Sequence, residues 1–237
     1  MKASRFSVIV VAAALCGPFA LGSGAVMAQP AANPVVVELY QSQGCSDCPP
    51  AQDYLNRLAD RPDVLALSFG VTYWDYLGWR DSFASPQFTQ RQRDYAKTSG
   101  TGEVATPQFW VNGEATVLGA NAGRVAQLIA SGAKTKGPSI NLTSSQVSIG
   151  SGSALQDAAD VWLVRYDPRT IQVAIRAGEN GGRTLPHRDI VRQMTKIGRW
   201  TGQPLAIGIR PPTDPALKTA ILVQAGSGGR ILAAAKG

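Results

Sequence analysis

The sequence predicts an α/β unit, a mixed central sheet flanked by helices, followed by an antiparallel β-rich part. Over residues 34–134, patterns typical of strands and helices follow one another in the order β-α-β-α-β-β-α. Two cysteines stand where the first strand leads into the first helix. From residue 139 onward, short alternating segments replace the helical patterns. We therefore expect two domains, residues 34–134 and residues 139–237, the second resembling a sandwich.

The first strand and helix have clear local signals. Residues 35–40 are rich in β-branched side chains, which is typical of a buried strand. Residues 49–60 carry apolar side chains at helical spacing. Pro49 and Pro50 fit the first turn of this helix, because the N–H groups there have no intrahelical partner. Residues 45–48 are therefore expected at a helix N-terminus.

The second strand and helix complete a parallel unit. Residues 64–69 form an apolar run, and the helix before it separates it from residues 35–40. Parallel pairing of the two runs follows, since a crossover helix is the usual connection between parallel strands. A second helix is expected to begin at Pro86 and to run to about residue 98.

A hairpin and a third helix close the α/β unit. Residues 105–119 hold two apolar runs joined by Asn112-Gly113, the strongest short signal for a β-hairpin. Pro107 stands at the start of the first run, where a strand tolerates proline. A helix is expected over residues 121–132.

The C-terminal part is expected to begin after Gly137 and Pro138, the clearest boundary in the chain. Residues 161–166 and 170–175 flank Asp167-Pro168 and are predicted to pair as a hairpin. Further strands are expected over residues 205–209, 220–224 and 231–234, with a second hairpin at Gly228-Gly229.

Cys45 and Cys48 form a CxxC pair, whose spacing suits a redox dithiol, an inert disulfide or part of a metal site. A helix N-terminus favours a thiolate through its free N–H groups and its dipole. This setting favours a redox pair with Cys45 as nucleophile and Cys48 as resolving thiol. Asp47 acts in the opposite direction, because a nearby carboxylate disfavours a thiolate.

A metal site is disfavoured because the chain has few residues that could serve as ligands. The chain has three cysteines and one histidine, so only His187 would remain beside the CxxC pair as a soft ligand of the exported chain. A structural zinc site uses four such ligands. Copper binding by both thiolates is a further alternative, but no histidine or methionine stands near the pair. We expect neither a metal nor another cofactor.

Four aromatic residues follow the second strand, at the sheet edge where parallel α/β proteins form their sites. They are Tyr73, Trp74, Tyr76 and Trp79. The segment suits two roles equally, a wall beside the dithiol that contacts substrate or a packed cover of the sheet end. His187 lies in a second polar segment, residues 179–189. An acid/base or partner-binding role is open to it, but a structural loop is the favoured interpretation.

The N-terminal residues 1–28 have the pattern of a secretory signal peptide. Lys2 and Arg5 precede an apolar run, and residues 26–28 offer small side chains for cleavage. An uncleaved anchor is the alternative. Removal of the segment leaves 21 basic and 16 acidic residues, a net charge of +5. The basic residues are scattered, so nucleic-acid binding is not expected, and no later stretch is apolar enough to span a membrane.

Export places the protein in the periplasm or outside the cell, which are oxidising compartments. A disulfide between Cys45 and Cys48 is expected there unless another molecule reduces it.

The element order, the CxxC pair and Thr106-Pro107 before the third strand resemble the thioredoxin fold. More narrowly, the chain resembles secreted thioredoxin-like proteins grouped as domain-of-unknown-function family 1223. The segments that carry this resemblance are residues 38–50, 73–79, 83–86 and 181–187.

The resemblance implies several site features. Pro107 is expected in the cis form against the dithiol, and Thr106 would then pair with the backbone of a bound peptide. Tyr73 and Trp74 would shape access for the substrate. Glu38 is a candidate for the buried acid that accepts a proton from the resolving cysteine, although it lies one residue upstream of the usual place.

These observations lead to a functional expectation, an exported thiol-disulfide oxidoreductase. Its substrates would be protein or small thiols and disulfides, and an unidentified partner would restore its redox state. The alternative is a non-catalytic binding or structural protein with a thioredoxin-like shell and a permanent Cys45–Cys48 disulfide.

Overall fold

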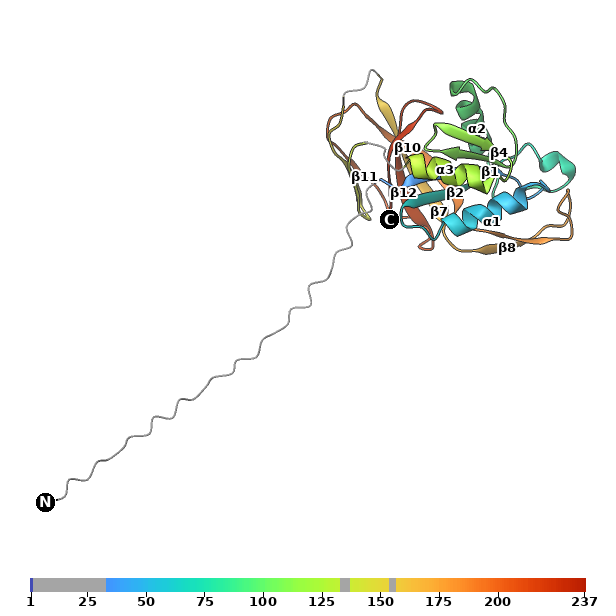
Figure 1. The fold of residues 1–237 in the computed structure, drawn as a ribbon, viewed down its shortest axis with the longest axis horizontal. Helices are drawn as coiled ribbons and strands as arrows, with labels where there is room; N and C mark the ends of the chain where they lie inside the picture. The colour runs from blue at the N-terminus through green and yellow to red at the C-terminus, as the bar shows by residue number, and fades with distance from the viewer. Residues whose placement is uncertain (2–32, 133–136, 154–156) are drawn as a thin grey trace.

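The structure is a computed structural model that describes Met1 and residues 33–132, 137–153 and 157–237. All but the first residue of the predicted signal peptide lie outside the described residues. The described chain forms a mixed eight-stranded sheet, three α-helices and two small antiparallel sheets (Figure 1).

The N-terminal elements follow the expected order. They are β1 (Val35–Gln41), α1 (Cys48–Leu58), β2 (Val64–Gly70), the short 3₁₀ helix η1 (Asp75–Leu77), α2 (Pro86–Thr98), β3 (Gln108–Val111), β4 (Ala115–Leu118) and α3 (Ala122–Gly132). The pairing of β1 with β2 is parallel, and the pairing of β1 with β3 is antiparallel. The β3–β4 hairpin turns at Asn112-Gly113, where both residues have positive φ as a two-residue hairpin turn requires.

The helices cover the two faces of this sheet. Side chains of α1 and α3, such as Leu55 and Ile129, pack on Val37 and Leu39 of β1. Side chains of α2, such as Tyr95, pack on the opposite face. Alternate residues of β1 therefore face different helices, because successive side chains of a strand point to opposite faces.

The remaining strands extend the same sheet. They are β5 (Ile140–Leu142), β6 (Gln146–Ile149), β7 (Ala159–Asp167), β8 (Ile171–Ala174), β9 (Thr184–His187), β10 (Ile190–Trp200), β11 (Leu205–Gly208), β12 (Lys218–Gln224) and β13 (Ile231–Lys236). The strand order of the large sheet is β13-β12-β7-β10-β2-β1-β3-β4.

The large sheet is continuous across the boundary expected at Gly137 and Pro138. The junction is between β10 and β2, where Ile190 pairs with Ser68 and the Ser68 N–H donates to Asp189 O at 2.8 Å. A small β11-β6-β5 sheet packs on the C-terminal half, with Val147 and Ile149 buried against Val161 and Ile221. A sandwich-like core is thus present, but one of its layers is the continuous sheet.

The predicted hairpin of residues 161–166 with 170–175 is wrong. Strand β7 pairs with β10 and β12, whereas β8 pairs with β9 as a separate two-stranded arm. The burial pattern explains the difference, because β7 is buried almost throughout and β8 is half exposed. The second predicted hairpin, β12 with β13, is confirmed.

The β8–β9 arm lies along α1 (Figure 1). The Asn56 side chain donates to Pro186 O at 3.3 Å, and Arg188 pairs with Asp60 at 2.7 Å. The connection between β8 and β9 thereby reaches the N-terminal end of α1, where the two cysteines are.

Candidate functional site

The dithiol lies between the end of β1 and the first turn of α1. Cys48 is the first residue of the helix, and two prolines follow it. Both cysteines are free, their sulfur atoms are 2.7 Å apart, and both are buried, at 1% and 2% exposure. Other segments of the chain therefore cover Cys45 as well as Cys48.

The two thiols differ in acidity. The hydrogen bond that the Cys48 thiol donates lowers the pKa of Cys45 to about 7 against the opposing effect of burial, and backbone groups of the helix start lower it as well. Burial raises the pKa of Cys48 well above its usual value, and the neighbouring Cys45 raises it further. The pair can therefore hold one thiolate on Cys45 and one proton on Cys48 near neutral pH.

The Thr106–Pro107 segment lies against the first cysteine. The bond between these residues is cis, which confirms what the resemblance implied. The Cys45 thiol donates to the Thr106 carbonyl at 3.6 Å. The hydroxyl of Thr106 is buried and has no hydrogen-bond partner among the described residues.

The aromatic segment is tied to the same place. The Trp79 indole N–H donates to the Gln43 side chain at 2.9 Å, two residues before Cys45. Tyr73 and Trp74 are half-buried and pack on the core beneath α2, and the Tyr73 hydroxyl donates to Gln92 at 3.2 Å. The segment is thus hydrogen-bonded to the residues before Cys45 and also packs on the core.

A loop that joins β8 to β9 covers the dithiol segment, and we call residues 177–181 the covering loop. Asn180 is fully buried, and its side chain donates to Gln43 O at 3.0 Å and to Cys45 O at 2.7 Å. The Glu179 carboxylate accepts from the N–H and the hydroxyl of Ser46 at 2.9 and 2.8 Å. Sequence reasoning placed these residues in a polar loop but gave them no role.

Asp81 is a second residue that sequence reasoning missed. Its carboxylate accepts from the Gln43 N–H at 2.8 Å and from the Phe83 N–H at 2.8 Å. Burial raises the pKa of Asp81 to about 6. The aspartate fixes the strand end before Cys45, and the only signal in the sequence was its place within the aromatic segment.

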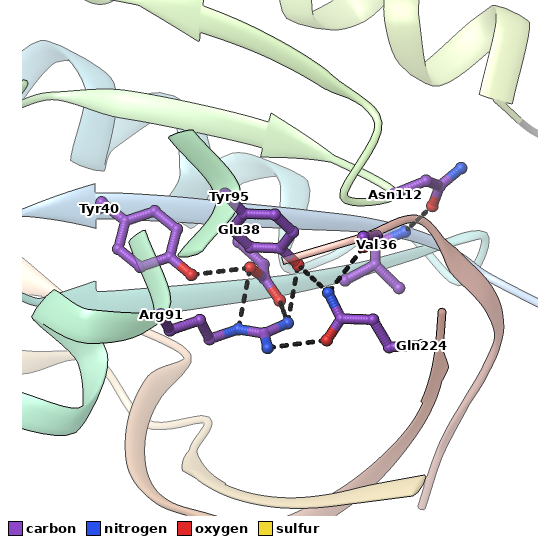
Figure 2. A network of polar contacts seen from close by, with 8 residues as sticks. Val36, Glu38, Tyr40, Arg91, Tyr95, Asn112 and Gln224 are labelled. Atoms are coloured by element: carbon purple, nitrogen blue, oxygen red, sulfur yellow. Dashed lines mark hydrogen bonds and ion pairs between the residues drawn. The ribbon is translucent and has the colours of Figure 1, made fainter. Parts of the chain in front are cut away.

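Glu38 is buried as proposed, but it does not contact the dithiol. It lies in β1 on the face opposite α1, as do Val36 and Tyr40 (Figure 2). Its carboxylate forms an ion pair with Arg91 at 2.6 Å and accepts from the Tyr40 hydroxyl at 2.9 Å. The predicted role as proton acceptor for Cys48 has no support in this geometry, because the sheet separates the two groups.

The Arg91 side chain extends this polar network into the C-terminal half. It donates to the Gln224 side chain of β12 at 2.9 Å and to the Tyr95 hydroxyl at 2.7 Å (Figure 2). Burial lowers the pKa of Arg91, but the Glu38 carboxylate raises it, and the net shift is upward. The network joins β1, α2 and β12 and is a structural feature of the core.

His187 is the last residue of β9 and lies near Cys48, in the lining of the same cavity. It is 2% exposed, and neither ring nitrogen has a hydrogen-bond partner among the described residues. Burial lowers its pKa to about 4, so the ring is neutral at pH 7. Together with Cys48 and Gln41 it lines a cavity of about 210 Å³.

The described residues contain no group of three or more histidine, cysteine, aspartate or glutamate side chains placed to hold a metal ion. In the same part of the chain, no helix is long and apolar enough to cross a membrane.

Comparison with known proteins places the chain in a family. A family model described as "Protein of unknown function (DUF1223)" matches residues 36–224. The chain belongs to the DUF1223 family. The matched range runs from β1 to the end of β12, so it includes the dithiol, the covering loop and the β8–β9 arm. No curated protein matches the chain.

Two solved structures are similar to this DUF1223 protein. Protein AGR_C_4864 from Agrobacterium tumefaciens is 31% identical, with a TM-score of 0.71, over 86% of this chain and 94% of that one. HBP35 of Porphyromonas gingivalis is 13% identical, with a TM-score of 0.54, over 87% of this chain and 75% of that one. The second likeness concerns the fold alone.

Proposed function

We propose that the protein is a thioredoxin-like thiol-disulfide oxidoreductase that works outside the cytoplasm. The element order β1-α1-β2-α2-β3-β4-α3, with a CxxC pair at the start of α1 and a cis proline before β3, supports the fold assignment. The observation that carries the activity is the placement of Cys45 and Cys48 at the start of α1 with their sulfur atoms 2.7 Å apart, and the unequal acidity of the two thiols supports it. A thiolate nucleophile beside a protonated resolving thiol is what disulfide exchange needs.

The reaction has two steps. The Cys45 thiolate attacks one sulfur of a substrate disulfide, forms a mixed disulfide and releases the other half as a thiolate. Cys48 then loses its proton and attacks Cys45, which forms the Cys45–Cys48 bond and releases the second half as a thiolate. The substrate gains two electrons and the protein loses two.

Thr106 and Pro107 would hold the substrate beside Cys45, and Tyr73 and Trp74 would shape its approach. The proposed place of work, the periplasm or the cell exterior, rests on the signal pattern of residues 1–28. In such compartments the pair needs a reductant or an oxidant to return to its starting state.

The burial of Cys45 favours a second candidate, a non-catalytic binding protein with a permanent disulfide. The covering loop holds the backbone of residues 43–46, and a large disulfide would need this loop to open. In this alternative Cys45 and Cys48 form a structural disulfide, and the covering loop and the aromatic segment form the binding surface.

The Cys48→Ser variant tests the proposal. With a small aromatic disulfide whose released thiolate is coloured, we expect the variant to release one equivalent and to keep the other half bound at Cys45. Intact-mass spectrometry measures the adduct. The parent protein, under the same conditions, is expected to release both halves and to carry no adduct. A Cys48→Ser protein that stays unmodified after a day with excess disulfide would favour the permanent link.

A further inference from the structure

The cavity beside Cys48 has features of a ligand site that the exchange reaction at Cys45 does not use. Its lining includes Cys48 but not Cys45. Two of the deeply buried polar residues in its lining are Gln41, at 1% exposure, and His187, at 2%. The side-chain amide oxygen of Gln41 and both His187 ring nitrogens have no hydrogen-bond partner among the described residues. Buried polar groups without partners are rare, because each one costs free energy.

The polar groups define what the cavity can bind. The neutral His187 ring offers one N–H donor and one acceptor, and Gln41 offers a carbonyl acceptor. The amide groups of a ligand carry the matching acceptors and donors. Pro49, Leu185 and Pro186 supply an apolar wall. The inner end of the cavity therefore suits a neutral polar group of the ligand rather than an ion.

The mouth of the cavity carries both signs of charge. Arg183 and Asp53 line it, and both side chains are exposed. The Arg183 guanidinium donates to Asn180 at 2.7 Å through one nitrogen and retains other N–H groups. A carboxylate can bind the arginine and an ammonium group can bind the aspartate. The chemistry at the mouth is thus that of a free amino acid or a short peptide.

The volume limits the size of the ligand. Pockets for drug-sized molecules enclose about 300–1,000 Å³, and this cavity encloses about 210 Å³. A protein segment would also have to pass between α1 and the β8–β9 arm, which are joined through Asn56 and Pro186. A molecule of the size of an amino acid or a short peptide fits both limits.

From these observations we propose that the cavity binds a low-molecular-weight thiol of the amino-acid or short-peptide class, which reduces the Cys45–Cys48 disulfide by attack on Cys48. This inference rests on the proposed function and adds the chemical class of its electron donor. The substrate disulfide would react with Cys45, and the donor thiol would attack Cys48 from the cavity.

The reduction balances in two steps. The thiolate of a bound donor attacks the Cys48 sulfur, a bond forms between donor and Cys48, and the Cys45–Cys48 bond breaks with its electron pair on Cys45. A second donor thiolate attacks the donor sulfur of this mixed disulfide and releases Cys48, which takes up a proton. Two donor thiols become one disulfide. Cys48 lines the cavity and Cys45 does not, and the thiol of lower pKa leaves faster, so both observations favour departure of Cys45.

Binding can be measured apart from redox chemistry with S-methylglutathione, which carries carboxylates, an ammonium group and amides but no thiol. We expect saturable binding to the oxidised protein by calorimetry. Gln41→Met and His187→Phe keep the side-chain shape and remove the hydrogen-bonding atoms, and each should weaken binding about tenfold. Arg183→Gln, at the exposed mouth, should weaken it about fivefold. Arg124→Gln on α3 is the matched control and should bind as the parent does.

The site of attack is found by mapping. Oxidised protein is mixed with glutathione, quenched with an alkylating reagent and digested. We expect glutathione on Cys48 and the alkyl group on Cys45 in the trapped intermediate. Glutathione on Cys45, or no binding of S-methylglutathione by parent and Arg124→Gln alike, overturns the proposal. The Cys48→Ser adduct described above does not depend on the cavity, so the proposed function can stand when this inference fails.

Discussion

Replacement of Arg91 by methionine is expected to lower the free energy of unfolding by about 3–5 kcal/mol. The reason is that the substitution leaves the Glu38 carboxylate buried without its partner. Glu38 is fully buried, and its ion pair with Arg91 at 2.6 Å lies in the core under α2. Without the guanidinium, the Glu38 carboxyl group would stay in the core without its charged partner. Equilibrium denaturation of the reduced protein by urea measures the loss.

Two controls separate this effect from a general loss of an arginine. Arg61 forms an ion pair with Asp63 at 2.6 Å, but both side chains are about half exposed. Arg61→Met should therefore cost less than about 1 kcal/mol. The double variant Glu38→Gln, Arg91→Met removes both charges and should recover part of the loss. Equal stability of Arg91→Met and Arg61→Met would show that the buried pair contributes nothing.

The Cys45→Ser variant is expected to lose exchange activity to the uncatalysed background, a fall of roughly 10³-fold or more. Serine cannot supply a thiolate, and Cys48 cannot replace it, because burial holds the pKa of Cys48 well above its usual value. Single-turnover release of the coloured thiolate measures the rate. An unchanged rate in Cys45→Ser would remove Cys45 from the mechanism.

The parent protein should show a matching pH dependence. The pKa of Cys45 is lowered to about 7, so its thiolate fraction rises as pH increases through that value and then levels off. The exchange rate is expected to follow the same curve between about pH 5 and 9. Cys48→Ala should show a curve displaced to higher pH, because alanine removes the hydrogen bond from Cys48, which is the largest cause of the lowered pKa of Cys45.

The N-terminal half of the fold and the core of the site were predictable because their signals are local. The strand–CxxC–helix sequence of residues 35–58 fixes a dithiol at a helix end through spacing alone. Asn112-Gly113 specifies its turn through the φ values that these residues tolerate. The cis form of Pro107 came from family resemblance, not from any periodicity.

The missed features depend on long-range pairing. Strand β10 joins the two halves of the sheet, but register shifts near residues 192 and 197 interrupt the alternation by which a strand is recognised. Asn180 acts on Gln43 and Cys45 from more than a hundred residues away. Glu38 pairs with Arg91 across the core. No local pattern records such contacts, so the sequence alone indicated only a polar loop and a buried acid.

The reduction potential of the Cys45–Cys48 pair tests the central claim most directly. Protein that lacks residues 1–28 is equilibrated in graded thiol buffers, and free thiols are counted by an alkylation gel shift. The proposed oxidoreductase predicts a potential within the span of exchange enzymes, roughly −120 to −270 mV. A value below about −300 mV is typical of a structural disulfide and would contradict the proposal in favour of the permanent link.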